Sequence, residues 1–204
     1  VPGSLYSLWV LQEGYNRSFP DGSSLADGSI SLVSGGGVGG SPVTVLVDTG
    51  GPWGRQRLLE LLWERGLSPG DITHLICTHG HSDHVGNLNL FPQATLLLGW
   101  DLSYGPGRYL PHGLAQGRPY VLHPGYLEVV PTPGHTLAHV SLVLRGTALG
   151  TVVVAGDLFE REEDEEVWRS LSEDPQEQER SRQRVLAMAD VIVPGHGAAF
   201  RVFR

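Results

Sequence analysis

Short apolar runs rich in Val, Ile and Leu recur along the chain, and polar or glycine-containing segments separate them. Runs of four to eight such residues are typical of strands that are buried on both faces. We predict strands over residues 43–47, 72–77, 95–98, 127–130, 139–144, 152–155 and 191–193.

Two further segments have helical spacing. Pro52 is suited to the first turn of a helix over 53–65, and Gly66 follows as a stop. A second helix is expected over about 175–189, where Glu, Gln and Arg alternate with a few apolar residues. Strands mixed with helices predict an α/β (α+β) fold with helices covering sheets, and 204 residues suit one domain spanning 1–204. The Trp and Met residues are expected mainly in the core.

The charge and the cysteine content restrict the binding partners and the cellular location that we expect. The formal net charge is −8, and all 14 basic residues are arginine, so no general nucleic-acid surface and no DNA-binding signal is evident. The acidic run over 160–166 is expected to be a solvated loop or helix start. Cys77 is the one cysteine, and neither a leader pattern nor an apolar run of about 18–20 residues is evident, so we expect no membrane span and a cytosolic or nuclear location.

The candidate chemistry lies where the predicted strands end. Five strands each run directly into a segment that carries an imidazole or a carboxylate. Strand ends on a rigid scaffold can hold several ligands in one cleft. These segments contain Asp48, His79 to His84, His135, Asp157 and His196.

The spacing His79-x-His81-x-Asp83-His84 places four potential metal ligands within six residues. Neutral imidazole nitrogen and carboxylate oxygen are ligands of divalent ions. With His135, Asp157 and His196 the set reaches seven, more than one tetrahedral ion requires, which favours two ions that share a carboxylate. A water held between two such ions would lose a proton near neutral pH, so hydrolysis is the implied reaction.

The order of these motifs resembles the metallo-β-lactamase superfamily. The matching stretches are T-H-x-H-x-D-H-x-G-N from Thr78, P-G-H-T from Pro133, G-D at Asp157 and P-G-H-G from Pro194. The resemblance implies an αββα sandwich with a dinuclear metal site at one edge of the two sheets. It extends from Asp48 to His196.

The resemblance also implies a role for each ligand. His79, His81 and His135 match the first metal site, and Asp83, His84 and His196 match the second. Asp157 matches the bridging carboxylate, and with Asp83 it is expected to be catalytic. Asp48 matches an aspartate that orients a ligand imidazole or pins its loop, although an ordinary Asx turn is the alternative.

An all-nitrogen-and-oxygen ligand set is similar to glyoxalase II and the metallo-ribonucleases. Zinc is the expected metal. Iron and manganese are alternatives because no thiolate is supplied, and Cys77 is expected to be a buried structural thiol.

The chain also resembles a vertebrate group within the superfamily, because it has no lysine and contains T-H-G-H-S-D-H directly after Cys77 and P-G-H-G from Pro194. That resemblance implies an endoribonuclease that cleaves the 3′ end of replication-dependent histone pre-mRNA as a homodimer. The alternative is a glyoxalase II-like thioesterase, an esterase or a lactonase, although the chain ends eight residues after His196 and so lacks the glutathione-binding helices of glyoxalase II. Candidate substrate contacts are Arg108, Tyr109, His112 and Arg118, in the Gly- and Pro-rich stretch over 99–125.

Overall fold

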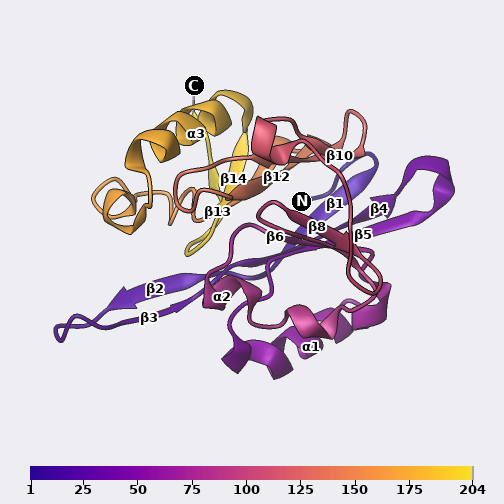
Figure 1. The fold of residues 1–204 in the computed structure, drawn as a ribbon, viewed down its shortest axis with the longest axis horizontal. Coiled ribbons are helices and arrows are strands. Elements are labelled where there is room, and N and C mark those ends of the chain that lie inside the picture. The colour runs from indigo at the N-terminus through magenta and orange to yellow at the C-terminus, as the bar shows by residue number, and fades with distance from the viewer. Residues whose placement is uncertain (204) are drawn as a thin grey trace.

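The apolar runs form the central strands of two sheets that pack face to face, with helices on the outer faces (Figure 1). The computed structural model describes residues 1–203. The first sheet has the order β1-β4-β5-β6-β7-β8-β9, and the second has the order β10-β11-β12-β13-β14-β15. The strands β5, β6 and β7 are parallel to one another, as are β13 and β14. This architecture is the expected α/β class with an αββα arrangement.

The strands of the first sheet are β1 (Tyr6–Gln12), β4 (Ile30–Gly36), β5 (Pro42–Val47), β6 (His74–Cys77), β7 (Thr95–Leu98), β8 (Asp101–Tyr104) and β9 (Arg108–Tyr109). Those of the second sheet are β10 (Tyr120–His123), β11 (Leu127–Pro131), β12 (Val140–Thr147), β13 (Gly150–Gly156), β14 (Val191–Pro194) and β15 (Phe200–Arg201). A separate two-stranded ribbon, β2 (Tyr15–Ser18) and β3 (Ser24–Asp27), stands away from both sheets in Figure 1. The helices are α1 (Arg55–Trp63), α2 (Ser82–Val85) and α3 (Pro175–Met188).

Alternation along β5 shows why its last three residues, 45–47, are all apolar. Val45 and Val47 point into the core between the two sheets, whereas Leu46 points the other way and packs with Leu58 and Leu62 of α1. Successive side chains of a strand face opposite sides, and both sides are covered here. The same layering covers the second sheet, where α3 packs on the outer face of β12, β13 and β14.

The tryptophan prediction is wrong for three positions, one of which is Trp100, 36% exposed just after β7. Trp168 is fully buried, but Trp53 and Trp63 are 61% and 80% exposed. They lie at the start and end of the α1 segment, away from the leucines that contact the sheet, so burying those leucines leaves them in solvent. Cys77 is buried and free, as expected. Within the described residues, no helix has both the length and the apolar character needed to span a membrane.

Candidate metal centre

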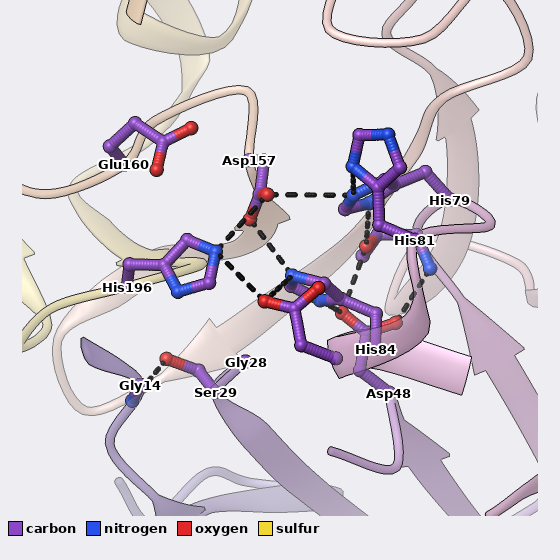
Figure 2. Close-up of polar contacts among 12 residues, drawn as sticks. Gly14, Gly28, Ser29, Asp48, His79, His81, His84, Asp157, Glu160 and His196 are labelled. Atoms are coloured by element: carbon purple, nitrogen blue, oxygen red, sulfur yellow. Dashed lines mark hydrogen bonds and ion pairs between the residues drawn. The ribbon is translucent and has the colours of Figure 1, made fainter. Parts of the chain in front are cut away.

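The seven predicted ligands meet at one end of the sandwich, although they come from four separate segments of the chain. His79 and His81 follow β6, and the single turn of α2 places Asp83 and His84 directly after them. The other three follow β11, β13 and β14, and all seven side chains form one cluster. Those three are His135, Asp157 and His196. Figure 2 shows five of the seven, His79, His81, His84, Asp157 and His196.

Four of the side chains form what we call the first group: His79, His81, His135 and Asp157. His81 Nδ1 lies 3.0 Å from His79 Nε2 and 3.1 Å from His135 Nε2. Asp157 Oδ2 lies 3.4 Å from His79 Nε2 and 3.3 Å from His135 Nε2. Four ligand atoms therefore converge on one small volume.

The second group consists of Asp83, His84 and His196. Asp83 Oδ2 lies 3.8 Å from His84 Nε2 and 3.5 Å from His196 Nε2. Asp157 reaches this group as well, with Oδ1 at 3.1 Å from His84 Nε2 and Oδ2 at 3.2 Å from His196 Nε2. The Asp157 carboxylate thus lies between the two groups.

These separations fit metal coordination. Ligand atoms at 2.0–2.1 Å from a tetrahedral zinc ion lie about 3.3 Å from one another. The contacts in the first group, 3.0–3.4 Å, are close to that value. In the described chain, the buried atoms His84 Nε2 and Asp157 Oδ1 also have no hydrogen-bond partner, and buried polar atoms of this kind need one. The residues present therefore fit a pair of divalent cations.

Outer contacts turn three of the imidazoles so that Nε2 faces inward. The Thr78 hydroxyl donates its proton to Asp48 Oδ2, so it can only accept from Nδ1 of His79 at 3.0 Å. Nδ1 of His84 donates to Asp48 Oδ2 at 2.8 Å. Nδ1 of His196 faces the backbone carbonyls of Tyr15 and Asp27 at 3.1 Å, which are paired at the open end of the β2 and β3 ribbon. In each neutral ring the free lone pair is then on Nε2, the form that a metal requires.

Asp48 therefore contacts the imidazole of a predicted ligand, His84, and its role in orienting that ligand stays a prediction. Its carboxylate reaches across the fold to His84 and to the backbone N–H of Thr78, 30 or more positions away, and not to its own turn. Its backbone is left-handed, with φ at 61°. Asp is among the few residues with a side chain that tolerate this region.

In the metal-free protein, the charges of the cluster compensate one another. Burial opposes the charged form of His84, but the carboxylates of Asp157 and Asp48 outweigh it and hold the pKa of His84 well above its usual value. For His196, the contact with Asp157 likewise outweighs burial and raises the pKa to about 9. Burial also opposes ionisation of Asp157, yet the neighbouring imidazoles hold its pKa well below the usual range. The Asp157 carboxylate therefore already pairs with protonated imidazoles when no metal is bound.

The other side of the cluster is held neutral. Burial is the main reason that the pKa of His135 falls to about 4, and it also lowers the pKa of His79. Behind them, His139 stacks on the ring of His79 with centroids 5.2 Å apart, and burial lowers its pKa to about 3. The ligands of the first group are therefore largely ready to bind a metal at neutral pH.

The prediction that the whole acidic run is solvated is wrong for Glu160 and Asp164, which are buried. Asp164 accepts two hydrogen bonds from Arg182 of α3, and Arg182 lies over the rings of Phe159 and Trp168. Glu160 is 2% exposed, and burial, followed by the nearby Asp157 carboxylate, raises its pKa to about 8. Its position three residues after Asp157, on the same loop, is the feature of the sequence that could have revealed it.

Two hollows open beside the cluster. The ligand cavity, of about 170 Å³, is lined by ligands of both groups together with Asn16, Ala26, Glu160 and Leu171. The Trp100 groove, of about 600 Å³, lies next to it and shares His81. Trp100 and Leu137 give this groove an apolar wall, and its carboxylates are those of Asp101 and Glu173.

The four predicted substrate contacts are not among the described residues that line either hollow. Arg108 and Tyr109 are exposed on the edge strand β9. His112 is held by the backbone, with Nε2 2.6 Å from the carbonyl oxygen of Trp100. Arg118 lies against Gly113. Sequence reasoning placed the right stretch near the site but missed Gly99, Trp100 and Asp101, the residues of that stretch that line the groove.

Residues 38–97 match the family described as the metallo-beta-lactamase superfamily. A Xenopus laevis protein named metallo-beta-lactamase domain-containing protein 1 is 55% identical, over all of this chain and 85% of its own length. The Homo sapiens protein of the same name is 53% identical, with the same coverage. The chain belongs to the metallo-β-lactamase superfamily.

Members of the superfamily with solved structures share the fold. A metallo-beta-lactamase from Thermotoga maritima superposes with a TM-score of 0.71 over 97% of this chain and 99% of its own, at 21% identity. A quorum-quenching N-acyl homoserine lactone lactonase gives a TM-score of 0.66 over 96% and 93%, at 18% identity. An N-acyl homoserine lactonase from a Bacillus species is also 28% identical over 50% of this chain and 44% of its own. Superfamily membership and the clustered His and Asp side chains together indicate a hydrolase with a metal site.

Proposed function

We propose that this protein is a dinuclear metal-dependent hydrolase, with zinc in both sites. The observation that carries the proposal is the convergence of two ligand groups on a shared carboxylate, Asp157. His79, His81 and His135 would hold one ion, Asp83, His84 and His196 would hold the other, and Asp157 would serve both. When bound, such ions acidify a water and stabilise the negative charge that develops on a substrate oxygen.

The chain's own residues position and protonate the reacting groups. Asp83 lines the ligand cavity and is partly exposed there, so we expect its carboxylate to take the proton from the attacking water. Asp157 is kept in place from behind, because Gln178 of α3 donates to its backbone carbonyl at 3.1 Å. Its fixed carboxylate keeps the two groups at a constant separation, as two-metal hydrolysis requires.

For the substrate, we propose a single strand of RNA, in particular the 3′ region of replication-dependent histone pre-mRNA, cleaved by a homodimer in the cytosol and nucleus. Support comes from the resemblance to the vertebrate group and from the Trp100 groove. Trp100 is 36% exposed beside the ligands, and an exposed aromatic ring can stack a base of a single strand. Arg184 lies in a further hollow that shares Trp100 and Leu137 with the groove, where it can meet a phosphate.

Two measurements test this proposal. Metal analysis of the purified chain should find two ions per chain, and Asp157→Ala should lose at least one ion and the activity, whereas the exposed, remote Asp71→Ala should keep both. Parallel assays should compare a histone pre-mRNA 3′ fragment, a random single-stranded RNA, a glutathione thioester and an N-acyl homoserine lactone. Cleavage of the histone fragment is the expected result. Cleavage of the thioester or the lactone alone would contradict the proposed RNA substrate but would still agree with the proposed hydrolase activity.

A small-molecule lactonase or esterase is the second candidate, because the Trp100 groove has apolar walls and carboxylates but no arginine among its described lining. N-acyl homoserine lactonases are also among the similar proteins. Trp100→Ala separates the candidates. Losing one stacked base should weaken RNA binding by roughly 5- to 150-fold, and the remote, exposed Trp63→Ala is the matched control.

A further inference from the structure

His135 lacks the outer contact that three other imidazoles of the proposed centre have. The Nδ1 atoms of His79, His84 and His196 all face a hydroxyl, a carboxylate or a carbonyl. Nε2 of His135 faces the other ligands, so its Nδ1 must carry the ring proton when a metal is bound. That Nδ1 is buried and has no hydrogen-bond partner in the described residues.

The Glu160 side chain faces this nitrogen and has a buried acceptor that also lacks a hydrogen-bond partner in the described residues. Oε1 of Glu160 lies 4.0 Å from Nδ1 of His135, and it too is buried without a partner in the described part of the chain. A separation of 4.0 Å is too long for a hydrogen bond, but a small side-chain rotation closes it. Two unsatisfied, complementary atoms this close each gain a partner if they meet.

The backbone of Glu160 is fixed, which makes this placement specific. Its N–H donates to Asp164 Oδ2 at 2.8 Å, and its carbonyl accepts from the N–H of His196 at 2.8 Å. Asp164 is itself held by the buried Arg182. The loop therefore delivers the Glu160 carboxyl group to the back of His135 from a rigid frame.

We propose that Glu160 is a positioning residue for His135, accepting a hydrogen bond from its Nδ1 and so fixing the ring with Nε2 toward the first group. The proposal rests on the proposed function, because it needs a metal at that group. It does not depend on the charge of Glu160, since either form of a carboxyl group has an oxygen that accepts. Outer contacts of this kind contribute roughly 10- to 100-fold to metal affinity.

Glutamine at this position keeps an accepting oxygen and the shape of the side chain, whereas leucine removes the acceptor. We therefore expect Glu160→Leu to weaken binding of one of two Zn²⁺ ions by roughly 10- to 100-fold in a chelator competition. Glu160→Gln should restore most of that affinity. The exposed neighbour Glu162→Gln is the matched control and should bind both ions like the unmodified chain.

A spectroscopic measurement separates this role from a merely structural one. In the zinc-loaded, ¹⁵N-histidine-labelled protein, Nδ1–H of His135 should give a downfield proton signal that is protected from solvent exchange. The signal should persist in Glu160→Gln and be lost or shifted upfield in Glu160→Leu. The unmodified protein must itself show the protected Nδ1–H signal of His135. The measurement therefore tests the proposed hydrogen bond even if Glu160→Leu does not fold.

Unchanged affinity and an unchanged His135 signal in Glu160→Leu would overturn the proposal. Loss of one whole ion in Glu160→Gln would also overturn it, because Glu160 would then be a ligand. Failure of the unmodified chain to bind two ions would instead overturn the proposed function, so the two failures are distinguishable.

Discussion

Asp48 Oδ2 accepts a hydrogen bond from Nδ1 of His84 at 2.8 Å, although the two residues lie 36 positions apart in the chain. Asp48 directly follows β5, and His84 lies in α2. The same carboxylate accepts the backbone N–H of Thr78 through Oδ1 at 2.7 Å. One side chain thus joins the end of β5 to the loop after β6 and contacts the imidazole of a predicted ligand.

Asp48→Asn should remove one of these two contacts and leave the other. Asparagine tolerates the left-handed backbone, but its amide has only one accepting oxygen, so either Thr78 or His84 loses its acceptor. We expect metal affinity to fall by roughly 10- to 100-fold and the free energy of unfolding of the metal-free protein to fall by about 1–3 kcal/mol. Chelator competition and urea unfolding measure the two effects. Asp71→Asn, which removes an exposed carboxylate bonded only to Ser68, is the control, and equal affinities in the two variants would contradict the assignment.

Gly195→Ala should abolish the shared carboxylate site without a backbone penalty. Gly195 does not have a left-handed backbone, but an added Cβ would lie 1.8 Å from Asp157 Oδ1. We expect the variant to fold with a normal circular dichroism spectrum and to lose at least one metal ion in elemental analysis. Gly36→Ala, whose Cβ would meet open space, should keep both ions. Full metal content in Gly195→Ala would show that Asp157 is not needed where the structure places it.

Metal affinity should rise with pH. His196 has a pKa of about 9 and the pKa of His84 is also raised, so both rings carry a proton at pH 7 in the metal-free protein. A metal can bind only the neutral rings, and it must therefore displace these protons. We expect the logarithm of Zn²⁺ affinity to increase between pH 6.5 and about 9 and to level off above it. Calorimetry in buffers of different ionisation enthalpy should detect proton release at pH 7, and a pH-independent affinity over this range would contradict the charge arrangement.

The buried pair of Arg182 and Asp164 should matter far more than a similar pair on the surface of the same helix. Arg182→Met leaves the Asp164 carboxylate buried and uncompensated, so we expect the free energy of unfolding to fall by about 3–5 kcal/mol. Arg180→Met breaks the exposed pair with Glu177 and should cost about 0–1 kcal/mol. Urea unfolding of both variants at the same metal content compares them. Similar midpoints would show that the Asp164 loop does not depend on Arg182.

The sequence was sufficient for the parts of the fold that are buried on both faces. The strands β5, β7 and β14 are continuous apolar runs, and their predicted ranges agree with the structure to within a residue. The amino-terminal strands were missed, because β1 mixes polar and apolar residues and β4 ends in serine and glycine. Such strands are recognisable mainly through their pairing partners, which local pattern does not show.

The site was predictable to the extent that its residues are themselves ligand types. The seven His and Asp side chains carry their chemistry in their identity, so strand ends and spacing were enough to bring them together. Glu160 was hidden in a run of six acidic residues around one arginine, and its burial depends on the contact between Asp164 and a helix that begins more than ten residues later. Trp100 was hidden because exposure of an aromatic ring is decided by packing of the surrounding loop.

The ligands enter the chain in the order His79, His81, Asp83, His84, His135, Asp157, His196, so the last one is 117 residues behind the first. At typical rates of synthesis, this interval amounts to roughly 6–23 s. During that time a nascent chain exposes imidazoles that lack their final neighbours, and the backbone carbonyls that receive His196 must wait near the amino terminus until it arrives. Closing the cluster therefore joins an amino-terminal segment to the segment after β14, and it can happen only after residue 196 has been synthesised.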